Sequence, residues 1–495
     1  MTIDSAAYAA AHTKPWRGTR AGDKALIFIV LITGLAGALR TLYLTSQGVT
    51  LDESFSLYLG RTSSIDFFHT IWESEFNMVL YYMLLRGWMH LGHGEWIVRF
   101  LGVLLSTATV PVIYSIGSRL FDRRTGIVAA LLIAVNPYHL MLAQRARSYP
   151  LAILLVSLSS LLFIRLVERP SPVSAMGYAL LSAASVYSHF FSLFVVVAQL
   201  CSILVLPKRR VPWKLLAVSL IVLAGLLVPF GWFALTHAST THVEWVQDLS
   251  VQQTLRVLYA LTLGKARSLI YLVLWCAAGY AWLRQPYTTR WPYAFLFAWL
   301  VVPIALTAAA SVRYPLMIER YLSVCLPASV LVASAGGIAL LRFSRVWAIG
   351  LLGIVLLYSL ATIRFYDRHP EFAEGWQEAS RSILSRVEPG DVVIAESLTG
   401  YTFDYYRDTF SKPLPAFWRL DSLETTLPKP LPANIWILAS TRFNPSWRGA
   451  APGAAEAAVQ KFAEAHQREY CPAPPYFQEG EAQVWQFRRC SNGKS

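Results

Sequence analysis

Long apolar segments separated by short polar loops fill the first three quarters of the chain. A transmembrane helix needs about 20 mostly apolar residues, and several of these segments approach or exceed that length. We therefore expect a multi-spanning α-helical membrane protein with about 11 transmembrane helices. The expected spans lie near residues 25–45, 98–118, 126–143, 151–167, 173–187, 190–206, 213–235, 268–283, 292–311, 321–341 and 346–363.

Every second loop between these segments is basic. Cytoplasmic loops of membrane proteins carry the excess of Lys and Arg, so this alternation predicts which loops face the cytoplasm. The same rule places the N-terminal segment, residues 1–24, on the cytoplasmic side. The basic loops contain Arg119, Arg123 and Arg124; Arg165 and Arg169; Lys208, Arg209, Arg210 and Lys214; Arg284 and Arg290; and Arg342 and Arg345.

The phase of the basic loops also decides how to interpret residues 77–91. This apolar segment is short and has Arg86 near its middle. If it crossed the membrane, the loop containing Arg119 would face outward, against its charge. We therefore expect an interfacial amphipathic helix on the outer surface, within one large outer loop formed by residues 46–96.

The pattern changes after the last apolar segment. Residues 365–495 contain 14 Lys and Arg against 16 Asp and Glu, whereas residues 1–364 contain 29 against 13. Helical spacing at 374–387 and buried-strand patterns at 391–395, 435–438 and 481–488 predict a small extracytoplasmic α/β domain. A basic membrane part with a near-neutral tail indicates membrane topology and an anionic lipid ligand, not a nucleic-acid partner.

Five cysteines fall into two groups. Cys201, Cys276 and Cys325 lie in apolar segments and are interpreted as packing residues. Cys471 and Cys490 lie in the outer domain, where oxidation is permitted, and we expect them to form a disulfide.

Adjacent carboxylates follow the first apolar segment. Asp52 and Glu53 fit two interpretations. A carboxylate at a membrane surface is able to serve as a general base, and an acidic pair at this position is also typical of a helix start, with Asp52 as the N-cap. Composition alone favours the helix start.

Other polar groups gather in the expected outer loops, each with a simpler structural interpretation beside the functional one. Arginines on an outer loop run against the charge rule, which indicates phosphate binding as strongly as interfacial snorkelling. A single histidine is more often structural, and Arg320 beside Glu319 also suits a plain ion pair. The candidates are Glu75, Asn77, Tyr81, Tyr82, Gln144, Arg147, Tyr149, His189, Arg320 and Tyr321.

Several nucleotide and metal motifs are absent from the sequence. It contains no HExxH, no pair of CxxC motifs, no Walker loop and no GxGxxG fingerprint. Energy from a cytoplasmic nucleotide is therefore not expected, and no residue pattern selects a metal.

Taken in order, these motifs resemble the bacterial polyprenyl-phosphate-dependent glycosyltransferases of the C-type membrane fold. That group includes protein O-mannosyltransferases, the aminoarabinose transferase that acts on lipid A, and proteins with an RgtA/B/C/D-like domain. One departure is that Met78 and Val79 replace two prolines of the family pattern. The matching motifs are Asp52-Glu53, Asn77 to Tyr82, Gly92 to Arg99, Arg119 to Gly126, Gln144 to Tyr149 and Arg320-Tyr321.

The resemblance implies an inverting transfer of a sugar from a polyprenyl-phosphate donor to an extracytoplasmic glycan, lipid or protein. Asp52 would be the catalytic base with Glu53 secondary, and Arg147 and Arg320 would bind the donor phosphate. The remaining candidates would bind substrate. Members of the family vary in metal dependence; the sequence shows no required cofactor, and a divalent metal stays an open alternative that no residue pattern supports. The expected location is the bacterial cytoplasmic (inner) membrane.

Two rival classes remain on the sequence alone. A transporter or flippase of lipid-linked sugars predicts charged residues near helix centres and internal repeats, and neither is clear here. An inactive scaffold that presents the outer domain is disfavoured by the retained Asp52-Glu53 pair.

Overall fold

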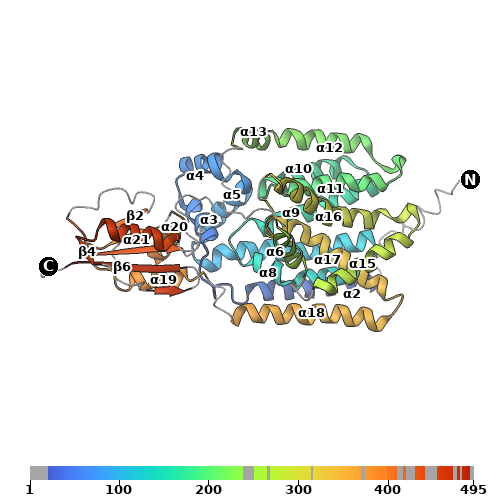
Figure 1. The fold of residues 1–495 in the computed structure, drawn as a ribbon. Coiled ribbons are helices and arrows are strands. Elements are labelled where there is room, and N and C mark those ends of the chain that lie inside the picture. The colour runs from blue at the N-terminus through green and yellow to red at the C-terminus, as the bar shows by residue number, and fades with distance from the viewer. Residues whose placement is uncertain are drawn as a thin grey trace, which may run out of the picture.

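A bundle of apolar helices forms the larger part of the computed structural model (Figure 1). The structure describes residues 20–237, 250–262, 264, 268–313, 316–368, 374–395, 397–409, 416–419, 430–440, 454–471, 477–479 and 482–490. Most of the segment expected on the cytoplasmic side, residues 1–19, therefore lies outside the described residues. The bundle consists of α2 (Arg20–Thr41), α6 (Glu95–Leu120), α7 (Arg123–Ala134), α8 (Pro137–Ala143), α9 (Tyr149–Glu168), α10 (Pro172–Ser188), α11 (Ser192–Ser202), α12 (Trp213–Leu226), α13 (Val228–Thr236), α14 (Val251–Leu261), α15 (Ser268–Arg284), α16 (Trp291–Ser311), α17 (Leu326–Leu340) and α18 (Arg345–Arg368).

Each of the eleven predicted apolar segments is helical in this bundle. Among the described residues, five helices are long and apolar enough to cross a membrane, or seven if two bent pairs each count as one span. The bent pairs are α7 with α8, at 56°, and α12 with α13, at 47°. Helical character is thus confirmed, while the number of eleven crossings stays a prediction.

The break between α7 and α8 has an identifiable cause. Asn136 caps α8 by accepting a hydrogen bond from the His139 amide at 2.9 Å, and Pro137 occupies the first turn. The buried Arg40 donates to the carbonyls of Ile133 and Ala134 at the end of α7. The guanidinium therefore satisfies backbone groups that the break leaves without helical partners. The break turns the chain into the loop that carries Arg147.

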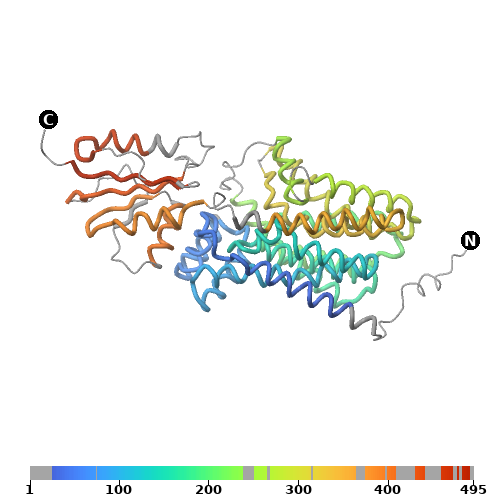
Figure 2. Tube along the Cα trace, turned by 90° about the horizontal axis from the view of Figure 1, so that it is seen from below, coloured from blue at the N-terminus to red at the C-terminus, as the bar shows by residue number. Residues whose placement is uncertain are grey.

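Short helices form a layer between the bundle and the C-terminal sheet in both views (Figure 1 and Figure 2). They are α3 (Leu51–Arg61), α4 (Ser64–Thr70) and α5 (Val79–Trp88), with a π turn at Ile71–Glu75 and 3₁₀ turns at Phe76–Met78 and Met89–Leu91. The helix expected within residues 77–91 is present as α5; its position on a membrane surface stays a prediction. The helix start favoured at Asp52-Glu53 is present as α3, whereas α4 was not expected, because it has no apolar run long enough to stand out.

The C-terminal part contains a mixed six-stranded sheet in the order β2-β1-β3-β6-β4, with β5 also paired to β6. The strands predicted near 391–395, 435–438 and 481–488 and the helix predicted at 374–387 are present. β1 pairs in parallel with β2 and β3, and β6 pairs antiparallel with β3. The elements are α19 (Trp376–Leu384), β1 (Val392–Ala395), α20 (Ser397–Thr409), β2 (Ala416–Arg419), β3 (Asn434–Ser440), α21 (Ala454–Ala465), β4 (Tyr470–Cys471), β5 (Phe477–Glu479) and β6 (Ala482–Arg489).

A disulfide joins the end of β4 to the residue after β6. The Cα atoms of Cys471 and Cys490 are 5.3 Å apart. The two strands are antiparallel neighbours, with Cys471 opposite Arg488, so their pairing brings the cysteines together. This is the pair expected from the sequence.

Candidate active site

The helix α3 presents the two adjacent carboxylates. Thr50 is its N-cap, and its hydroxyl accepts a hydrogen bond from the Glu53 amide at 3.3 Å. The Glu53 carboxylate in turn accepts from the Thr50 amide at 3.1 Å, which completes a capping box. The interpretation of Asp52 as the helix cap is therefore wrong: Thr50 provides the cap, and Asp52 lies in the first turn.

Glu53 points into the protein. Its side chain is 1% exposed and pairs with Arg99 of α6, with Nε–Oε1 and Nη2–Oε2 distances of 2.9 Å each. The Ala146 amide donates to the same carboxylate at 2.8 Å. Burial alone would raise the pKa of Glu53, but the Arg99 charge and these hydrogen bonds lower it below its ordinary value. Glu53 is thus a buried anion that fixes neighbouring segments and does not face an open site.

Asp52 points the other way and stays 38% exposed. Its Oδ2 accepts from Arg320 Nη1 at 2.5 Å, and its backbone carbonyl accepts from Arg147 Nη1 at 3.1 Å. Burial acts to raise the pKa of Asp52, yet the charges of Arg147, Arg320 and Arg145 outweigh it and lower the pKa. The carboxylate is therefore ionised at neutral pH and able to accept a proton.

Arg147 links Asp52 to a second acidic residue. Its Nη1 lies 3.4 Å from the hydroxyls of Ser56 and Tyr82, and Tyr82 donates to Glu75 at 3.0 Å. Burial raises the pKa of Glu75, and the nearby Arg147 opposes this only in part. Glu75, Tyr82 and Arg147 thus form one wall beside Asp52.

Aromatic side chains and His189 gather near the two arginines. The His189 ring centroid is 5.6 Å from that of Tyr149 and 5.2 Å from that of Tyr321. Burial, together with the charges of Arg147 and Arg320, lowers the pKa of His189 to about 3, so the imidazole is neutral.

Several buried polar atoms here have no hydrogen-bond partner among the described residues. They are both ring nitrogens of His189, the Tyr149 and Tyr138 hydroxyls, and Nε of Arg147. Buried polar groups are normally paired, so such a cluster beside two guanidiniums is typical of a site that receives a polar ligand.

Two of the candidate residues from the sequence form hydrogen bonds with backbone groups. The Gln144 amide donates to the carbonyls of Arg40 and Leu42 at 3.1 and 2.7 Å. The Asn77 side-chain oxygen accepts from the Phe190 amide at 2.9 Å. These contacts hold segments of the site in place, and substrate binding by either side chain stays a prediction. Tyr81 is fully buried behind Tyr82, with its hydroxyl near the charges of Glu53 and Arg147.

Arg99 and Tyr138 lie at the site but had no role assigned to them from the sequence. Arg99 had a detectable signal, because it lies four residues after Glu95 at the start of an apolar segment and was already part of a motif. Tyr138 had none, since it sits within an apolar run.

No group of three His, Cys, Asp or Glu side chains suited to a metal ion occurs in the part of the chain that the structure describes. The two carboxylates of the site are paired with guanidinium groups instead: Asp52 with Arg320 and Glu53 with Arg99.

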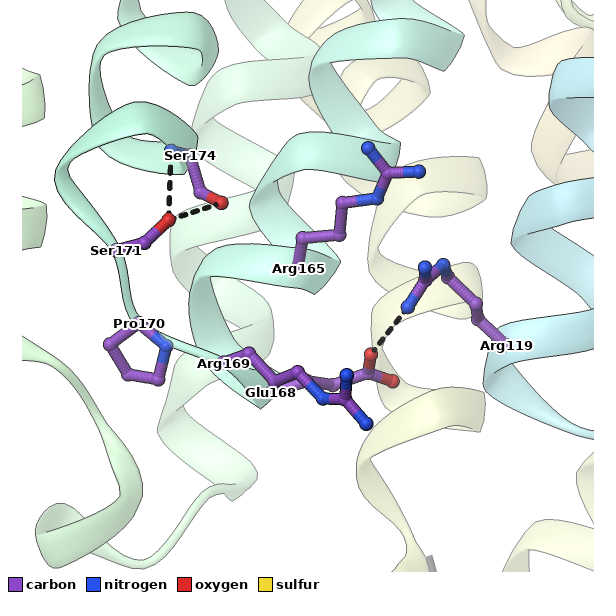
Figure 3. A pocket seen from close by; sticks show the side chains of 7 residues that line it. All are labelled: Arg119, Arg165, Glu168, Arg169, Pro170, Ser171 and Ser174. Carbon is purple, nitrogen blue, oxygen red and sulfur yellow. Dashed lines mark hydrogen bonds and ion pairs between the residues drawn. The ribbon is translucent and has the colours of Figure 1, made fainter. Parts of the chain in front are cut away.

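A separate pocket contains several arginines (Figure 3). Arg119 pairs there with Glu168 at 3.3 Å. The lining residues are Arg119, Arg165, Glu168, Arg169, Pro170, Ser171 and Ser174. Arg99 and Arg119 are 20 residues apart on α6, which corresponds to about 30 Å along a helix. Its arginines are those of two predicted cytoplasmic loops, so the pocket belongs to the other end of the bundle.

The Glu53–Arg99 pair generates a stability prediction. Removing one member of a buried pair typically costs about 3–5 kcal/mol, so Glu53→Gln should markedly lower the thermal unfolding temperature of the purified protein at pH 7. Because the pKa of Glu53 is lowered by folding, this stabilisation is present above its ordinary pKa of 4.5 and is lost as pH falls through the folded value. The difference between variant and parent should therefore shrink on acidification. Glu168→Gln, in an exposed pair, is the control and should change little; equal effects of the two variants would contradict the prediction.

Comparisons with known proteins agree with this architecture. Residues 78–232 match the family model described as dolichyl-phosphate-mannose-protein mannosyltransferase. No match was found among curated protein sequences.

Solved structures match over almost the whole chain. ArnT from Cupriavidus metallidurans bound to undecaprenyl phosphate has a TM-score of 0.60 at 13% identity, covering 92% of this chain and 97% of ArnT. The oligosaccharyltransferase of Archaeoglobus fulgidus tethered to an acceptor peptide has a TM-score of 0.53 at 13% identity, covering 91% of this chain and 69% of that protein. The oligosaccharyltransferase AglB from Archaeoglobus fulgidus, in complex with an inhibitory peptide and a dolichol-phosphate, has a TM-score of 0.51 at 13% identity, covering 90% of this chain and 69% of that protein. The family match over residues 78–232 and the shared fold agree with the resemblance expected from the sequence: this apolar helical chain has the fold of ArnT and of the archaeal oligosaccharyltransferase.

Proposed function

We propose that the protein transfers a sugar from a polyprenyl-phosphate donor to an extracytoplasmic glycan, lipid or protein, with inversion at the anomeric carbon. The observation that carries this proposal is the ionised Asp52 carboxylate between Arg147 and Arg320. A base and two phosphate-binding cations in one place are the groups that such a transfer needs. Similar folds have been solved with undecaprenyl phosphate and with a dolichol-phosphate, which supports a lipid-phosphate donor.

Each group has a defined task in this reaction. The acceptor hydroxyl donates its proton to Asp52 while its oxygen attacks the anomeric carbon. The bond from that carbon to the phosphate oxygen breaks, and the polyprenyl phosphate leaves with the electron pair. Arg147 and Arg320 stabilise the negative charge that develops on the leaving group.

The Asp52–Arg320 ion pair couples donor binding to the strength of the base. While Arg320 is bound to Asp52, the carboxylate is a weak base, because the nearby cations lower its pKa. A donor phosphate competes for the same guanidinium and adds negative charge beside the carboxylate. Asp52 then becomes a stronger base when the donor is in place. His189, Tyr149 and Tyr321, which contact one another near the arginines, are proposed to bind the donor. Glu75 and Tyr82 are proposed to bind the sugar or acceptor.

We also propose that the reaction needs no divalent metal. A metal at a phosphate-transfer site neutralises negative charge, and here guanidinium groups already pair with both carboxylates of the Asp52-Glu53 segment.

The proposed location is the bacterial cytoplasmic membrane, with the active site and the C-terminal domain outside. This topology has eleven crossings and a cytoplasmic N-terminus, as the alternating basic loops indicate. A cysteine in place of Asp122 should be labelled only after permeabilisation. A cysteine in place of Asp408 should be labelled in intact spheroplasts. Labelling of position 122 from outside would overturn the topology.

The base assignment predicts a large loss of turnover in Asp52→Asn. General-base catalysis contributes about 10²–10⁴-fold, so sugar transfer should fall by that order while donor binding is largely retained. Asp66→Asn is the matched control, since Asp66 lies in the first turn of the neighbouring helix α4 and is exposed. Near-normal transfer by Asp52→Asn would end the assignment and favour a transporter without transferase chemistry.

A chelator added to the parent enzyme should leave the rate unchanged; a loss restored by Mg²⁺ or Mn²⁺ would overturn the metal-independent proposal.

Phosphate binding by the two arginines predicts weaker donor affinity in Arg147→Ala and Arg320→Ala. Loss of a charge-assisted hydrogen bond costs about 1.5–3 kcal/mol, or about 10- to 150-fold. Lysine at either position should restore only part of the affinity, because the guanidinium fork is lost. Arg119→Ala, at the far pocket, is the control and should bind donor normally. Unchanged donor affinity and turnover in both site variants would remove phosphate binding as their role.

A further inference from the structure

The C-terminal domain contacts the helix that carries Asp52. The Glu374 carboxylate, just before α19, accepts a hydrogen bond from the Leu51 amide at 2.9 Å. Leu51 is the first residue of α3 and precedes Asp52 directly. Amides of a first helical turn have no partner within the helix, and a carboxylate is favourable at this end. Glu374 thus adds a second cap to α3, supplied from more than 300 residues along the chain.

Glu374 is itself held in a fixed position. The same Oε2 atom accepts from the indole nitrogen of Trp376 at 2.9 Å, and Trp376 is fully buried. The carboxylate therefore joins the core of one domain to the backbone next to the proposed base. Its position is set by packing in the C-terminal domain and not by α3 alone.

Two hydroxyl contacts flank this cap. Thr402 of α20 is fully buried and donates to the Ser54 hydroxyl at 2.9 Å, while Ser54 donates to the Leu51 carbonyl at 2.7 Å. The Tyr406 hydroxyl, one turn further on α20, accepts from the Val49 amide at 2.7 Å and donates to Glu95 at 3.1 Å. The residues before and after Asp52 are therefore both bonded to the C-terminal domain.

Apolar packing makes these contacts part of one core. A single cluster of buried side chains includes Val49 and Leu57 of the outer loop together with Trp376, Phe403 and Trp436 of the C-terminal domain. Tyr401 adds a ring contact with Tyr58, at 4.2 Å between centroids. A shared core of this kind is characteristic of parts that hold a fixed relative position.

The outer rim of the same interface provides a contrast. Arg61 and Asp408 form a 3.1 Å ion pair, but their side chains are 26% and 53% exposed. Exposed pairs contribute little to stability. The buried hydrogen bonds between the C-terminal domain and α3 are thus concentrated at the N-terminal end of α3, next to Asp52.

From these contacts we propose that the C-terminal domain is a positioning element of the active site, with Glu374 as its principal positioning residue. Glu374 fixes the first turn of α3 so that Asp52 meets Arg147 and Arg320. This inference rests on the proposed function for the role of Asp52. The C-terminal domain would then contribute to turnover and would not be merely an accessory attached to the membrane bundle.

Glu374→Ala tests the proposal in the full-length enzyme. Small misplacements of a reacting group cost on the order of 10- to 100-fold in rate, so kcat should fall by that order while the KM for donor changes little. The acid limb of the pH–rate profile should also move to higher pH if Asp52 shifts away from its cations. Glu374→Gln keeps an oxygen acceptor for Leu51 and Trp376, so it should restore most of the activity. Asp408→Asn, at the exposed rim, is the matched control.

A cross-link provides an independent test, because it compares the oxidised and reduced forms of one variant. The hydroxyls of Ser54 and Thr402 are 2.9 Å apart, so Ser54→Cys with Thr402→Cys should form a disulfide on oxidation. A fixed positioning element predicts equal turnover in the oxidised and reduced forms. An oxidised form that is inactive and recovers on reduction would show that the domain must move, and would overturn the proposal.

The two hypotheses fail in different measurements. Normal kcat and pH profile in folded Glu374→Ala, beside an inactive Asp52→Asn, would overturn the positioning role and leave the proposed function intact. An active Asp52→Asn would overturn the base assignment, whatever Glu374→Ala shows. If Glu374→Ala does not fold, two measurements test the positioning role instead. They are the comparison of Glu374→Gln with the parent and the cross-link experiment.

Discussion

The buried ion pair between Glu53 and Arg99 is the interaction on which the site depends. Glu53 binds the Ala146 amide as well as Arg99, and Arg99 also donates to the carbonyls of Leu44, Gln47 and Gly48. One pair thus joins the chain after α2, the start of α3, α6 and the loop before α9. A buried charge is tolerated only when it is paired and hydrogen-bonded, so these segments must come together for either residue to be accommodated.

This anchoring explains why neighbouring carboxylates have different tasks. Successive residues at a helix start point in different directions, so when Glu53 turns inward, Asp52 turns toward the open side. There it meets Arg147 and Arg320, whose loops lie before α9 and before α17. The inward acid holds the loop containing Ala146, and this loop in turn presents Arg147 to the outward acid.

The sequence predicted much of the architecture because its signals are local. Apolar segments long enough for membrane helices were helical in every case, and the strands near Ile394, Ile437 and Val484 were found where the apolar runs lie. Three residues from separate motifs, Asp52, Arg147 and Arg320, lie together in the structure although they are up to 268 residues apart in the chain. The family resemblance, carried by the order of the motifs along the chain, singled out these residues. No local sequence pattern gives the distance between them in space.

The sequence by itself therefore determined the helical membrane bundle, the α/β tail and the identity of the polar residues that gather at one end. Only the tertiary structure decided which acid is buried, that Thr50 caps α3 in place of Asp52, and that Gln144 and Asn77 bind backbone. It also brought Glu374 to the amide of Leu51. The physical reason is that periodicity and charge act over a few neighbouring residues, whereas burial and pairing of a charge depend on partners supplied by distant segments.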